Sequence, residues 1–397
     1  MKIVHIEDFF HPDAGYQINV LAKYQANAGH EVIILTSEID KIPDFLTIFF
    51  GKDNIEQKDR EYESKYGVKI IRYPIYTYYS GRSMFHIGLK KYIDKLKPNM
   101  LYVHGDGTFA CIRFIMAFGK TDYGIIFDSH MLKMASENPL SKMYENIFRM
   151  VFTPMIKRKK MVFIRTQDDD YLEKYLGIPL TQAPVVSHAT DQLLFKPDSE
   201  TRERVRRELG IQQDEFVVIY AGKLIESKGA DLLAAAFQDT FDTSRKITLL
   251  VVGNTSGAFG ESVEETFRHS KNRIIRVQTQ PYSKLAGFYC AADLAVFPKQ
   301  CSLSFYDVQA CGLPVVEEDN NVNKDRLSHN NGLCFREGDV QDFRNKLLKV
   351  FNMPEDNFSQ MGKSSIQYVN ESFSYDKVYK LYEEVIENEW KRQMHSI

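Results

Sequence analysis

The chain begins MKIVHIEDFFHPDAGYQINVLAKYQANAGHEVIILTS (residues 1–37), and this stretch predicts the fold class. KIVHIE (2–7) and EVIILTS (31–37) are continuous apolar runs, which are typical of strands covered on both faces. Between them, Ile18, Leu21 and Ala22 follow helical spacing up to Gly29, a residue type that often ends helices. A strand, a helix and a strand in this order form a βαβ unit, which implies a parallel sheet.

The same alternation runs through the chain and restarts near residue 215. The further expected strands are 68–74, 101–105, 124–130 and 161–166, then 215–222, 246–253, 273–279, 294–299 and 314–318. The segment 196–205 between the two series is polar, and it contains Pro197, so it is the expected linker. We therefore predict an α/β protein with two tandem Rossmann-like, doubly wound domains, 1–195 and 196–374, and an amphipathic helix in 375–397.

Composition excludes several classes of protein. The chain has 397 residues, 44% of them hydrophobic and 26% charged, with a net charge of −2, which excludes a disordered chain and a strongly basic nucleic-acid binder. Its five cysteines form no C-x-x-C pair, so neither a disulfide framework nor a zinc site is expected. The chain starts directly with a strand and lacks a signal-peptide core or an apolar run of about 18 residues, so we expect a cytoplasmic protein.

Two segments carry the chemistry. In FPKQCSLSFYDVQACGLPVVEED (297–319) a loop leads into a short helix, whose free N–H groups suit a diphosphate and whose Asp307 suits a ribose hydroxyl. An ordinary strand–helix crossover is the alternative. In YAGKLIESKGADLL (220–233), Lys223 and Lys228 lie between a strand and a helix and are suited to clamping phosphates. The spacing is not that of a Walker A loop, and no G-x-G-x-x-G follows a strand.

These segments resemble the family 4 retaining glycosyltransferases (group 1), which have the GT-B fold of two domains facing a central cleft. The family pattern G-R-L followed by K-G-x-D-x-L matches Gly222–Asp231, with Lys223 in place of Arg. The family pattern E-x7-E followed by A-x-A-x-G-x-P-V-V matches the region up to Val316, with Asp307 as the second acid and Lys299 in place of the first. Weaker matches cover nearly the whole chain.

The resemblance implies a retaining enzyme of polysaccharide biosynthesis that moves a sugar from a nucleotide-diphosphate sugar, with UDP expected, to a glycan, glycolipid or other hydroxyl acceptor. It implies no cofactor, no essential metal and a last helix that returns to the first domain. It also implies the following site: His130, Lys223 and Lys228 as catalytic residues; Gly15, Lys299, Gln300, Ser302, Leu303, Ser304, Asp307 and Tyr282 around the donor; and His104 on the acceptor side.

Some observations leave alternatives open. Lys299 donates hydrogen bonds where the family's Glu accepts them, so either the donor sugar carries a carboxylate or Lys299 turns away and Gln300 or Ser302 contacts the sugar. Asp168–Asp170 is expected to cap the helix near Tyr171 and not to bind a metal.

The first domain also contains apolar residues beside a basic run at 140–163. This stretch indicates either a peripheral contact with the inner membrane face or a core helix followed by solvated charges. Two rival functions stay open. One is a nucleotide-sugar-binding protein without transferase activity, which the departures at Lys299 and at Ala189, where the family pattern has Gly, keep open; the other is a sugar-nucleotide epimerase of the same fold.

Overall fold

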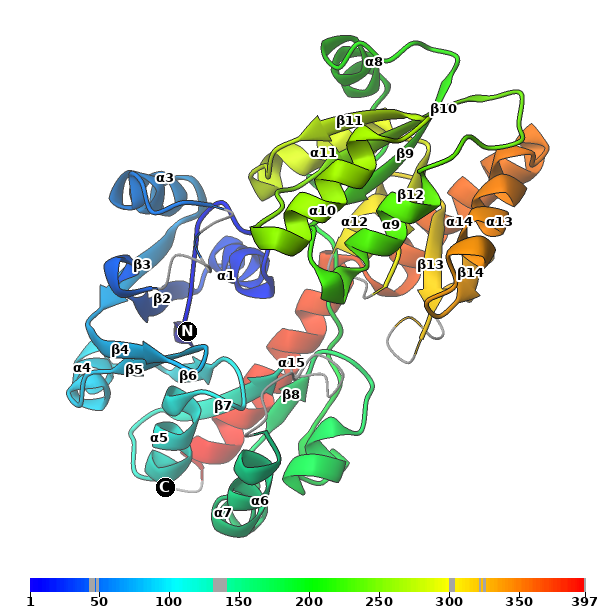
Figure 1. The fold of residues 1–397 in the computed structure, drawn as a ribbon. Coiled ribbons are helices and arrows are strands. Elements are labelled where there is room, and N and C mark those ends of the chain that lie inside the picture. Colours follow the sequence, from blue (N-terminus) through cyan, green and yellow to red (C-terminus); the bar gives the residue numbers. More distant parts are fainter. Residues whose placement is uncertain are drawn as a thin grey trace. The chain divides into compact units, whose positions relative to one another are not determined.

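The computed structural model describes residues 1–42, 47, 50–130, 141–299, 304–320, 323 and 326–395. Contacts divide the chain into two units. Unit 1 consists of Met1–His188 with Asp376–Ile397, and unit 2 of Ala189–Tyr375. Both units are α/β, and each contains a six-stranded sheet, as the alternating sequence pattern predicts (Figure 1).

In unit 1 the strand order is β3-β2-β1-β6-β7-β8, and every pair in this sheet is parallel. The elements are β1 (Lys2–Glu7), α1 (Gln17–Asn27), β2 (Glu31–Ser37), α3 (Ile55–Tyr66), β3 (Val68–Tyr73), β4 (Ile75–Tyr79), β5 (Arg82–Phe85), α4 (Leu89–Leu96), β6 (Met100–Val103), α5 (Phe109–Ala117), β7 (Gly124–Ser129), α6 (Ser141–Val151), α7 (Thr153–Lys159), β8 (Phe163–Arg165) and α15 (Tyr375–Met394).

The antiparallel hairpin β4–β5 has no counterpart in the sequence prediction. Its turn consists of Ser80 and Gly81, both with positive φ (48° and 80°), which is the geometry of a tight hairpin turn. The aromatic run before this Ser-Gly pair is the signal that would have revealed the hairpin.

The last helix, α15, packs on unit 1. The Gln393 side chain accepts a hydrogen bond from the Ile125 N–H and donates one to the Ile125 carbonyl, both at 2.9 Å. Farther along, the Tyr382 hydroxyl, fully buried, donates to the Val186 carbonyl at 3.1 Å. The chain therefore ends in unit 1 although most of unit 2 precedes this helix.

In unit 2 the strand order is β11-β10-β9-β12-β13-β14, again with every pair parallel. The elements are α8 (Ser199–Glu208), β9 (Glu215–Ala221), α9 (Ala230–Ala236), β10 (Lys246–Val252), α10 (Gly257–Arg268), β11 (Arg273–Val277), α11 (Tyr282–Ala291), β12 (Leu294–Phe297), α12 (Ser304–Ala310), β13 (Val315–Asp319), β14 (Gly332–Arg336), α13 (Val340–Phe351) and α14 (Glu355–Ser372).

Strand β9 shows why its sequence is continuously apolar. Val217 and Ile219 belong to one hydrophobic cluster, whereas Phe216, Val218 and Tyr220 belong to another. Because successive side chains of a strand point to opposite faces, both faces of the sheet are covered.

The division between the units differs from the expected boundary at residue 195. It falls after His188, because Thr190 pairs with the other end of unit 2: its N–H donates to Phe373 O and its carbonyl accepts from Tyr375 N. Phe195, 1% exposed, also packs in a unit 2 cluster. The expected linker 196–205 is largely helical, since α8 begins at Ser199.

Candidate active site

The strand orders fix where ligands are expected in each unit. In unit 1 the chain moves outward from β1 through β2 to β3, then returns to place β6 on the other side of β1. Unit 2 repeats this change of direction between β9 and β12. Open parallel sheets bind ligands at the carboxyl ends of the strands at such a switch point. The candidate sites are therefore the residues after β1 and β6 and those after β9 and β12.

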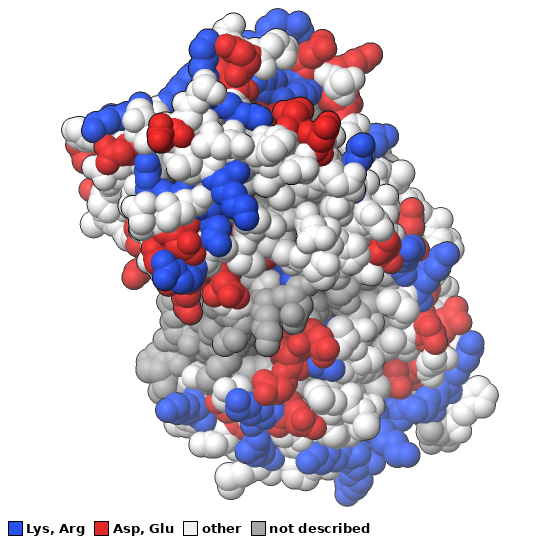
Figure 2. Space-filling view, turned by 90° about the vertical axis from the view of Figure 1, so that its right-hand side faces the viewer, with Lys and Arg blue, Asp and Glu red and all other residues white. Residues whose placement is uncertain are grey.

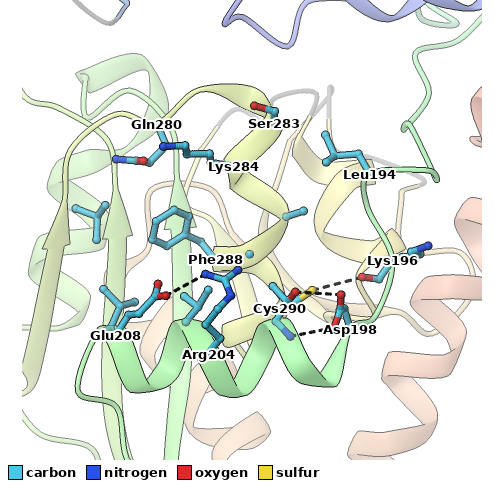
Figure 3. A pocket seen from close by; sticks show the side chains of 16 residues that line it. Leu194, Lys196, Asp198, Arg204, Glu208, Gln280, Ser283, Lys284, Phe288 and Cys290 are labelled. Carbon is cyan, nitrogen blue, oxygen red and sulfur yellow. Dashed lines mark hydrogen bonds and ion pairs between the residues drawn. The ribbon is translucent and has the colours of Figure 1, made fainter. Parts of the chain in front are cut away.

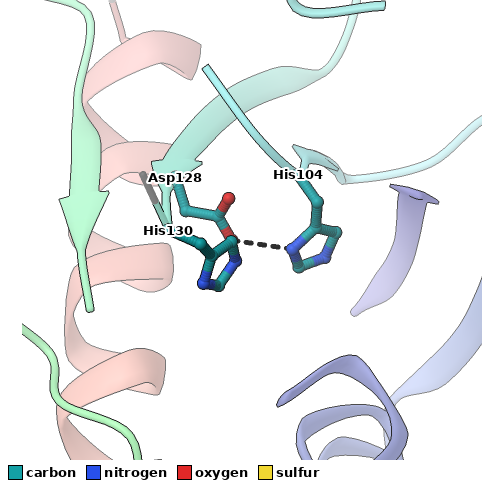
Figure 4. Close-up of side chains that lie close together, drawn as sticks. All are labelled: His104, Asp128 and His130. Atoms are coloured by element: carbon teal, nitrogen blue, oxygen red, sulfur yellow. Dashed lines mark hydrogen bonds and ion pairs between the residues drawn. The ribbon is translucent and has the colours of Figure 1, made fainter. Parts of the chain in front are cut away.

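In unit 1 a buried hydrogen-bond network lies at the switch point. The Asp128 carboxylate, at the end of β7, accepts from His104 Nδ1 at 2.7 Å, from His130 Nε2 at 3.1 Å and from the Gly105 N–H at 2.8 Å (Figure 4). Behind it, the other ring nitrogen of His104 lies 3.0 Å from His5 Nδ1. Asp128 and His5 are fully buried, whereas the His130 side chain is 34% exposed.

The electrostatics of this network follow from burial and pairing. Burial opposes the charge on Asp128, but the adjacent His130 and His104 outweigh it and hold the pKa of Asp128 well below its usual value. Burial likewise opposes the charge on His130, yet the Asp128 carboxylate raises the pKa of His130 above its usual value. Burial together with neighbouring His104 lowers the pKa of His5 to about 3, so His5 is neutral. His130 is thus the partly exposed, charge-bearing end of a buried chain.

A cavity of about 250 Å³ opens beside His130. It is lined by residues that follow β1 and β6 and by the β4–β5 turn: Glu7, Asp8, Phe9, Tyr78, Gly81, Arg82, His104, Gly105, Asp106, Gly107, Thr108 and His130. The sequence prediction included only the two histidines. The acidic residues of this region could have been found because they lie at or just after the ends of strands: Glu7 and Asp8 in H-I-E-D, Asp106 in H-G-D-G, and Asp128 in F-D-S-H.

His104, expected on the acceptor side, lines this cavity, but the residue is only 2% exposed and both ring nitrogens have hydrogen-bond partners. Gly15 lies in the loop between β1 and α1, two residues before Gln17. Asp169 accepts a hydrogen bond from the Tyr171 N–H at 2.8 Å, which is the capping role expected for the acidic run.

Within the described residues, His104, Asp128 and His130 also form a group whose ligand atoms lie within 4.8 Å of one another, close enough to hold a metal ion. A cation there would have to displace the ring protons that both histidines share with Asp128. The negative charge of Asp128 is already paired with N–H groups of His104 and His130, so the geometry favours a hydrogen-bonded network over a metal centre.

In unit 2, glycines bring the segments of the switch point together. A Cβ at Gly253, where φ is +154°, would overlap the Gly222 carbonyl oxygen, so the ends of β10 and β9 meet only through glycine. Gly229, with φ +70°, lies against Pro298 and the Lys299 side chain. The loop that carries Lys228 therefore packs on the residues that follow β12.

Some of the residues expected around the nucleotide-sugar donor lie at the carboxyl ends of the strands of unit 2. Lys223 follows β9, and burial lowers the pKa of its ammonium group. The backbone carbonyl of Lys299 accepts from Asn320 and Asn323, at 3.2 and 2.9 Å. Gln300, Ser302 and Leu303 lie outside the described residues, and Ser304 is the first described residue of α12.

Asp307 on α12 is 2% exposed. Its Oδ1 accepts from the Thr190 hydroxyl at 2.6 Å and from the Tyr282 hydroxyl at 3.4 Å. Burial raises the pKa of Asp307 to about 8 despite these hydrogen bonds. Tyr282 thus contacts the carboxyl group expected to hold the ribose.

A larger hollow of about 640 Å³ in unit 2 was not predicted. It lies between α8 and α11 (Figure 3). Arg204 and Glu208 pair along α8 at 3.0 Å on one side of the hollow, and Phe288 and Cys290 of α11 face the same space. Its lining includes residues of the expected linker 196–205, among them Lys196, Asp198 and Arg204, and Val277 of the expected strand 273–279.

The surface of unit 1 has an exposed apolar face on α6. Met143, Ile147, Met150 and Val151 are 48–77% exposed and lie on one side of the helix. The following helix, α7, ends in the basic run 157–160. Figure 2 shows Lys and Arg side chains gathered along the lower edge of one view of the molecule. No helix among the described residues has both the length and the apolar character needed to span a membrane.

Comparison with solved structures shows the fold. Over 100% of this chain and 99% of the other, the protein superposes on sucrose-phosphate synthase from Thermosynechococcus elongatus with a TM-score of 0.71 at 18% identity. A glycosyltransferase from Rickettsia africae gives 0.74 at 14% identity, and HepE from Anabaena, in complex with UDP and glucose, gives 0.72 at 14% identity. Each of these two covers 98% of this chain, and the match spans 98% and 100% of their own lengths.

Sequence comparison identifies a part of unit 2. D-inositol 3-phosphate glycosyltransferase of Segniliparus rotundus is 31% identical over 165 residues, which are 40% of this chain and 36% of that protein. The Corynebacterium glutamicum enzyme of the same name is 30% identical over 176 residues, 41% of each chain. The match thus spans about two fifths of the length of these curated relatives. Residues 201–367 match the family described as glycosyl transferases group 1. This segment is therefore similar to the glycosyl transferases group 1, within a chain that has the fold of solved glycosyltransferases.

Proposed function

We propose that the protein is a retaining glycosyltransferase that moves a sugar from a nucleotide-diphosphate sugar, with UDP as the expected nucleotide, to a hydroxyl acceptor. One observation carries the proposal: Lys223, Lys228 and Asp307 lie in the segments around the switch point of unit 2, within the residues that match the glycosyl transferases group 1. The solved neighbour HepE contains UDP, which supports the choice of nucleotide.

In this proposal unit 2 binds the donor and unit 1 binds the acceptor. Lys223 and Lys228 neutralise the diphosphate as the bond from the anomeric carbon to its oxygen breaks, a role that needs no metal because two ammonium groups supply the positive charge. Asp307 accepts hydrogen bonds from the ribose. The acceptor hydroxyl forms the new bond to the anomeric carbon, and its proton leaves to the departing phosphate. Retention and the role of His130 beside the donor sugar rest on the family resemblance.

The experiment measures thermal stability against UDP, GDP and ADP, followed by release of UDP from UDP-sugars. We expect one nucleoside diphosphate to raise the melting temperature and Lys223→Ala and Lys228→Ala each to weaken its binding about 10–100-fold, because each removes a charge-assisted hydrogen bond. The exposed Lys349→Ala is the matched control on the same unit. Equal binding by all four proteins would refute the clamp.

Two rivals give different results in the same assays. A nucleotide-sugar-binding protein without transferase activity would show the thermal shift but no turnover with any acceptor. An epimerase would convert one UDP-sugar into another without releasing UDP. Lys299, which stands where the family has Glu, calls for one more comparison, between turnover of a donor sugar that carries a carboxylate and turnover of its neutral counterpart. Faster turnover of the acidic donor would support a contact between Lys299 and the carboxylate.

We also propose that unit 1 contacts an anionic membrane surface through α6 and α7. Exposed Met143 and Met150 would enter the interface, while the basic run 157–160 would lie over anionic headgroups. Sedimentation with phosphatidylglycerol vesicles tests this contact. Met150→Glu should abolish sedimentation, whereas Met116→Glu on α5, where the native side chain is 51% exposed, should not. A wild-type protein that stays in the supernatant at low salt would refute it.

A further inference from the structure

Two cysteines of unit 2 lie against each other. Cys290 is in the last turn of α11, and Cys311 directly follows α12; both are free thiols, 7% and 6% exposed. They belong to the same hydrophobic cluster, and their thiol groups are hydrogen-bonded to each other. The described residues place no third metal ligand beside them, so a zinc ion would lack the four ligands it usually takes. The chemistry open to two adjacent thiols without a metal is the formation of a disulfide.

The segment that leads into α8 contacts both sulfur atoms. The Cys290 thiol donates to the Lys196 carbonyl at 3.4 Å (Figure 3), and its sulfur accepts from the Asp198 N–H. The Cys311 sulfur in turn accepts from the backbone of Lys196. Because one short stretch of backbone contacts both sulfurs, the pair is held together by hydrogen bonds as well as by packing.

Cys290 differs from Cys311 in its access to small molecules. Its side chain lines the hollow of about 640 Å³ between α8 and α11, whereas Cys311 is not among the lining residues (Figure 3). Arg202 of α8 lies beside it, and its guanidinium donates to the Cys290 carbonyl at 3.0 Å. A partly accessible thiol near a cation is the arrangement found at reactive cysteines, whereas a thiol sealed in an apolar core is inert.

The protonation of the pair follows from its hydrogen bonds. The hydrogen bond from the Cys311 thiol lowers the pKa of the Cys290 thiol, although burial acts in the opposite direction. The same hydrogen bond, together with burial, raises the pKa of Cys311 well above its usual value. Cys290 is therefore the thiol that ionises first, and the thiolate is the form that acts as a nucleophile.

We propose that Cys290 and Cys311 form a reversible disulfide in response to hydrogen peroxide, and that this bond weakens nucleotide binding by unit 2. In the first step the Cys290 thiolate attacks one peroxide oxygen, the O–O bond breaks, and a sulfenic acid forms while the leaving hydroxide takes up a proton. The Cys311 sulfur then attacks the Cys290 sulfur, the S–O bond breaks, and the leaving hydroxide takes the Cys311 proton to form water. In sum the two thiols lose two electrons and two protons, and the peroxide is reduced to two water molecules.

The disulfide acts on the nucleotide site because the same two helices carry both. Tyr282 is the first residue of α11, and its hydroxyl donates to Asp307 on α12 at 3.4 Å. Asp307 and Cys311 are one turn apart, and the Cys311 N–H donates to the Asp307 carbonyl at 3.2 Å. A covalent bond is shorter than a hydrogen-bonded contact, so closure draws the ends of α11 and α12 together and displaces Asp307. This effect rests on the proposed function, in which Asp307 accepts from the ribose, whereas the disulfide itself does not.

The test starts from the full-length protein, reduced with dithiothreitol and then exposed to hydrogen peroxide. Peptide mapping by mass spectrometry under non-reducing conditions should find Cys290 joined to Cys311, and dithiothreitol should separate them again. Calorimetry should show UDP binding about tenfold weaker in the oxidised protein, the size of one charge-assisted hydrogen bond. A map without this linked peptide would overturn the site. A mapped disulfide with unchanged UDP affinity would overturn its effect on the nucleotide.

Variants assign the two roles. Cys311→Ala leaves Cys290 without a second thiol, so peroxide should give a sulfenic acid on Cys290 that dimedone traps, and no disulfide. Cys290→Ala should give neither product, and UDP affinity should ignore peroxide in both variants. Cys334→Ala, which removes a partly buried thiol on β14 of the same unit, is the matched control and should respond as wild type does.

Two further outcomes separate the claims. Dimedone labelling of Cys311 in Cys290→Ala, as fast as that of Cys290 in Cys311→Ala, would overturn the assignment of Cys290 as the thiol that meets the peroxide. If the reduced wild-type protein does not bind UDP, the proposed function fails, and the peptide map by itself still decides whether the disulfide forms.

Discussion

Asp307 makes a sharp prediction about pH. Its carboxyl group is buried, and burial raises its pKa to about 8, so it is mostly protonated at pH 6 and ionised above pH 8. The ionised carboxylate is the stronger acceptor for ribose hydroxyl groups, so we expect the ionised form to be the one that binds ribose. The ionised share of the protein rises from about 1% at pH 6 to about 50% at pH 8, so binding by the ionised form should tighten about 50-fold, or about 2.3 kcal/mol, between these two pH values.

The unliganded protein should show the opposite trend in stability. Between pH 4 and pH 8 the folded state holds a proton on Asp307 that the unfolded chain has released. The stabilisation from this proton is complete below the unfolded pKa, near 4, and is lost as the pH rises through the folded pKa, near 8. The free energy of unfolding should therefore fall by about 1.4 kcal/mol per pH unit across this window through Asp307 alone.

Asp307→Asn isolates the effect, because it removes the titrating group and keeps the shape. Calorimetric titration with UDP from pH 6 to pH 8.5 should give a much flatter profile in this variant, with weaker binding than wild type at pH 8. The phosphate groups of UDP titrate identically in both proteins, so the difference between the profiles reports Asp307. The exposed Asp356→Asn is the control and should follow wild type. Parallel profiles for wild type and Asp307→Asn would refute the ribose role.

Three further changes test the architecture. Gly253→Ala should lower the free energy of unfolding, measured with denaturant, by about 3 kcal/mol or more, because the new Cβ would overlap a neighbouring backbone carbonyl. Gly257→Ala, at φ +66° in open space, should lower it by only about 1–2 kcal/mol. Equal losses in the two variants would contradict the close approach at Gly253. Gln393→Met should lower the free energy of unfolding by about 2–4 kcal/mol and speed hydrogen exchange at the Ile125 amide, because both hydrogen bonds to the Ile125 backbone are lost. Unchanged exchange would argue against the contact between Gln393 and Ile125. Asp128→Asn should lower the pKa of the His130 imidazole by about one unit in NMR titration, since the carboxylate that favours the charged ring is gone; an unchanged titration would contradict the pairing.

The fold could be predicted from sequence because its signal is local. The central strands of both sheets are short apolar runs, and burial of both faces removes the polar positions that would otherwise obscure them. The predicted strands agree with the observed ones to within two residues at each end, whereas the partly buried edge strand β14 was not predicted. The hairpin β4–β5 lacked this signal, since Tyr76 and Tyr79 are exposed and aromatic residues occupy both of its faces.

The site was harder to predict because its contacts are distant in sequence. His104 and Asp128 are 24 residues apart and meet only because β6 and β7 pair in parallel. The family resemblance pointed to His130 but not to Asp128, whose carboxylate raises the pKa of the His130 ring. Asp8 and Asp106 read as ordinary polar loop residues until the strand order placed them at one edge. Likewise Thr190, which binds Asp307 at a separation of 117 residues, carried no recognisable pattern.

The two switch points show what topology leaves undecided. In both units the order in which strands are added reverses beside the first strand of the sheet. In both units, polar residues follow the carboxyl ends of the two strands that flank this point. Around β9 and β12 those residues include the cations Lys223, Lys228 and Lys299; around β1 and β6 they include Glu7 and Asp106. A diphosphate is matched in charge by the first arrangement, because ammonium groups lie where its negative charge would be. The fold thus sets where ligands are expected, and the cations at the switch point of unit 2 are the reason that we propose this unit as the one that binds the donor.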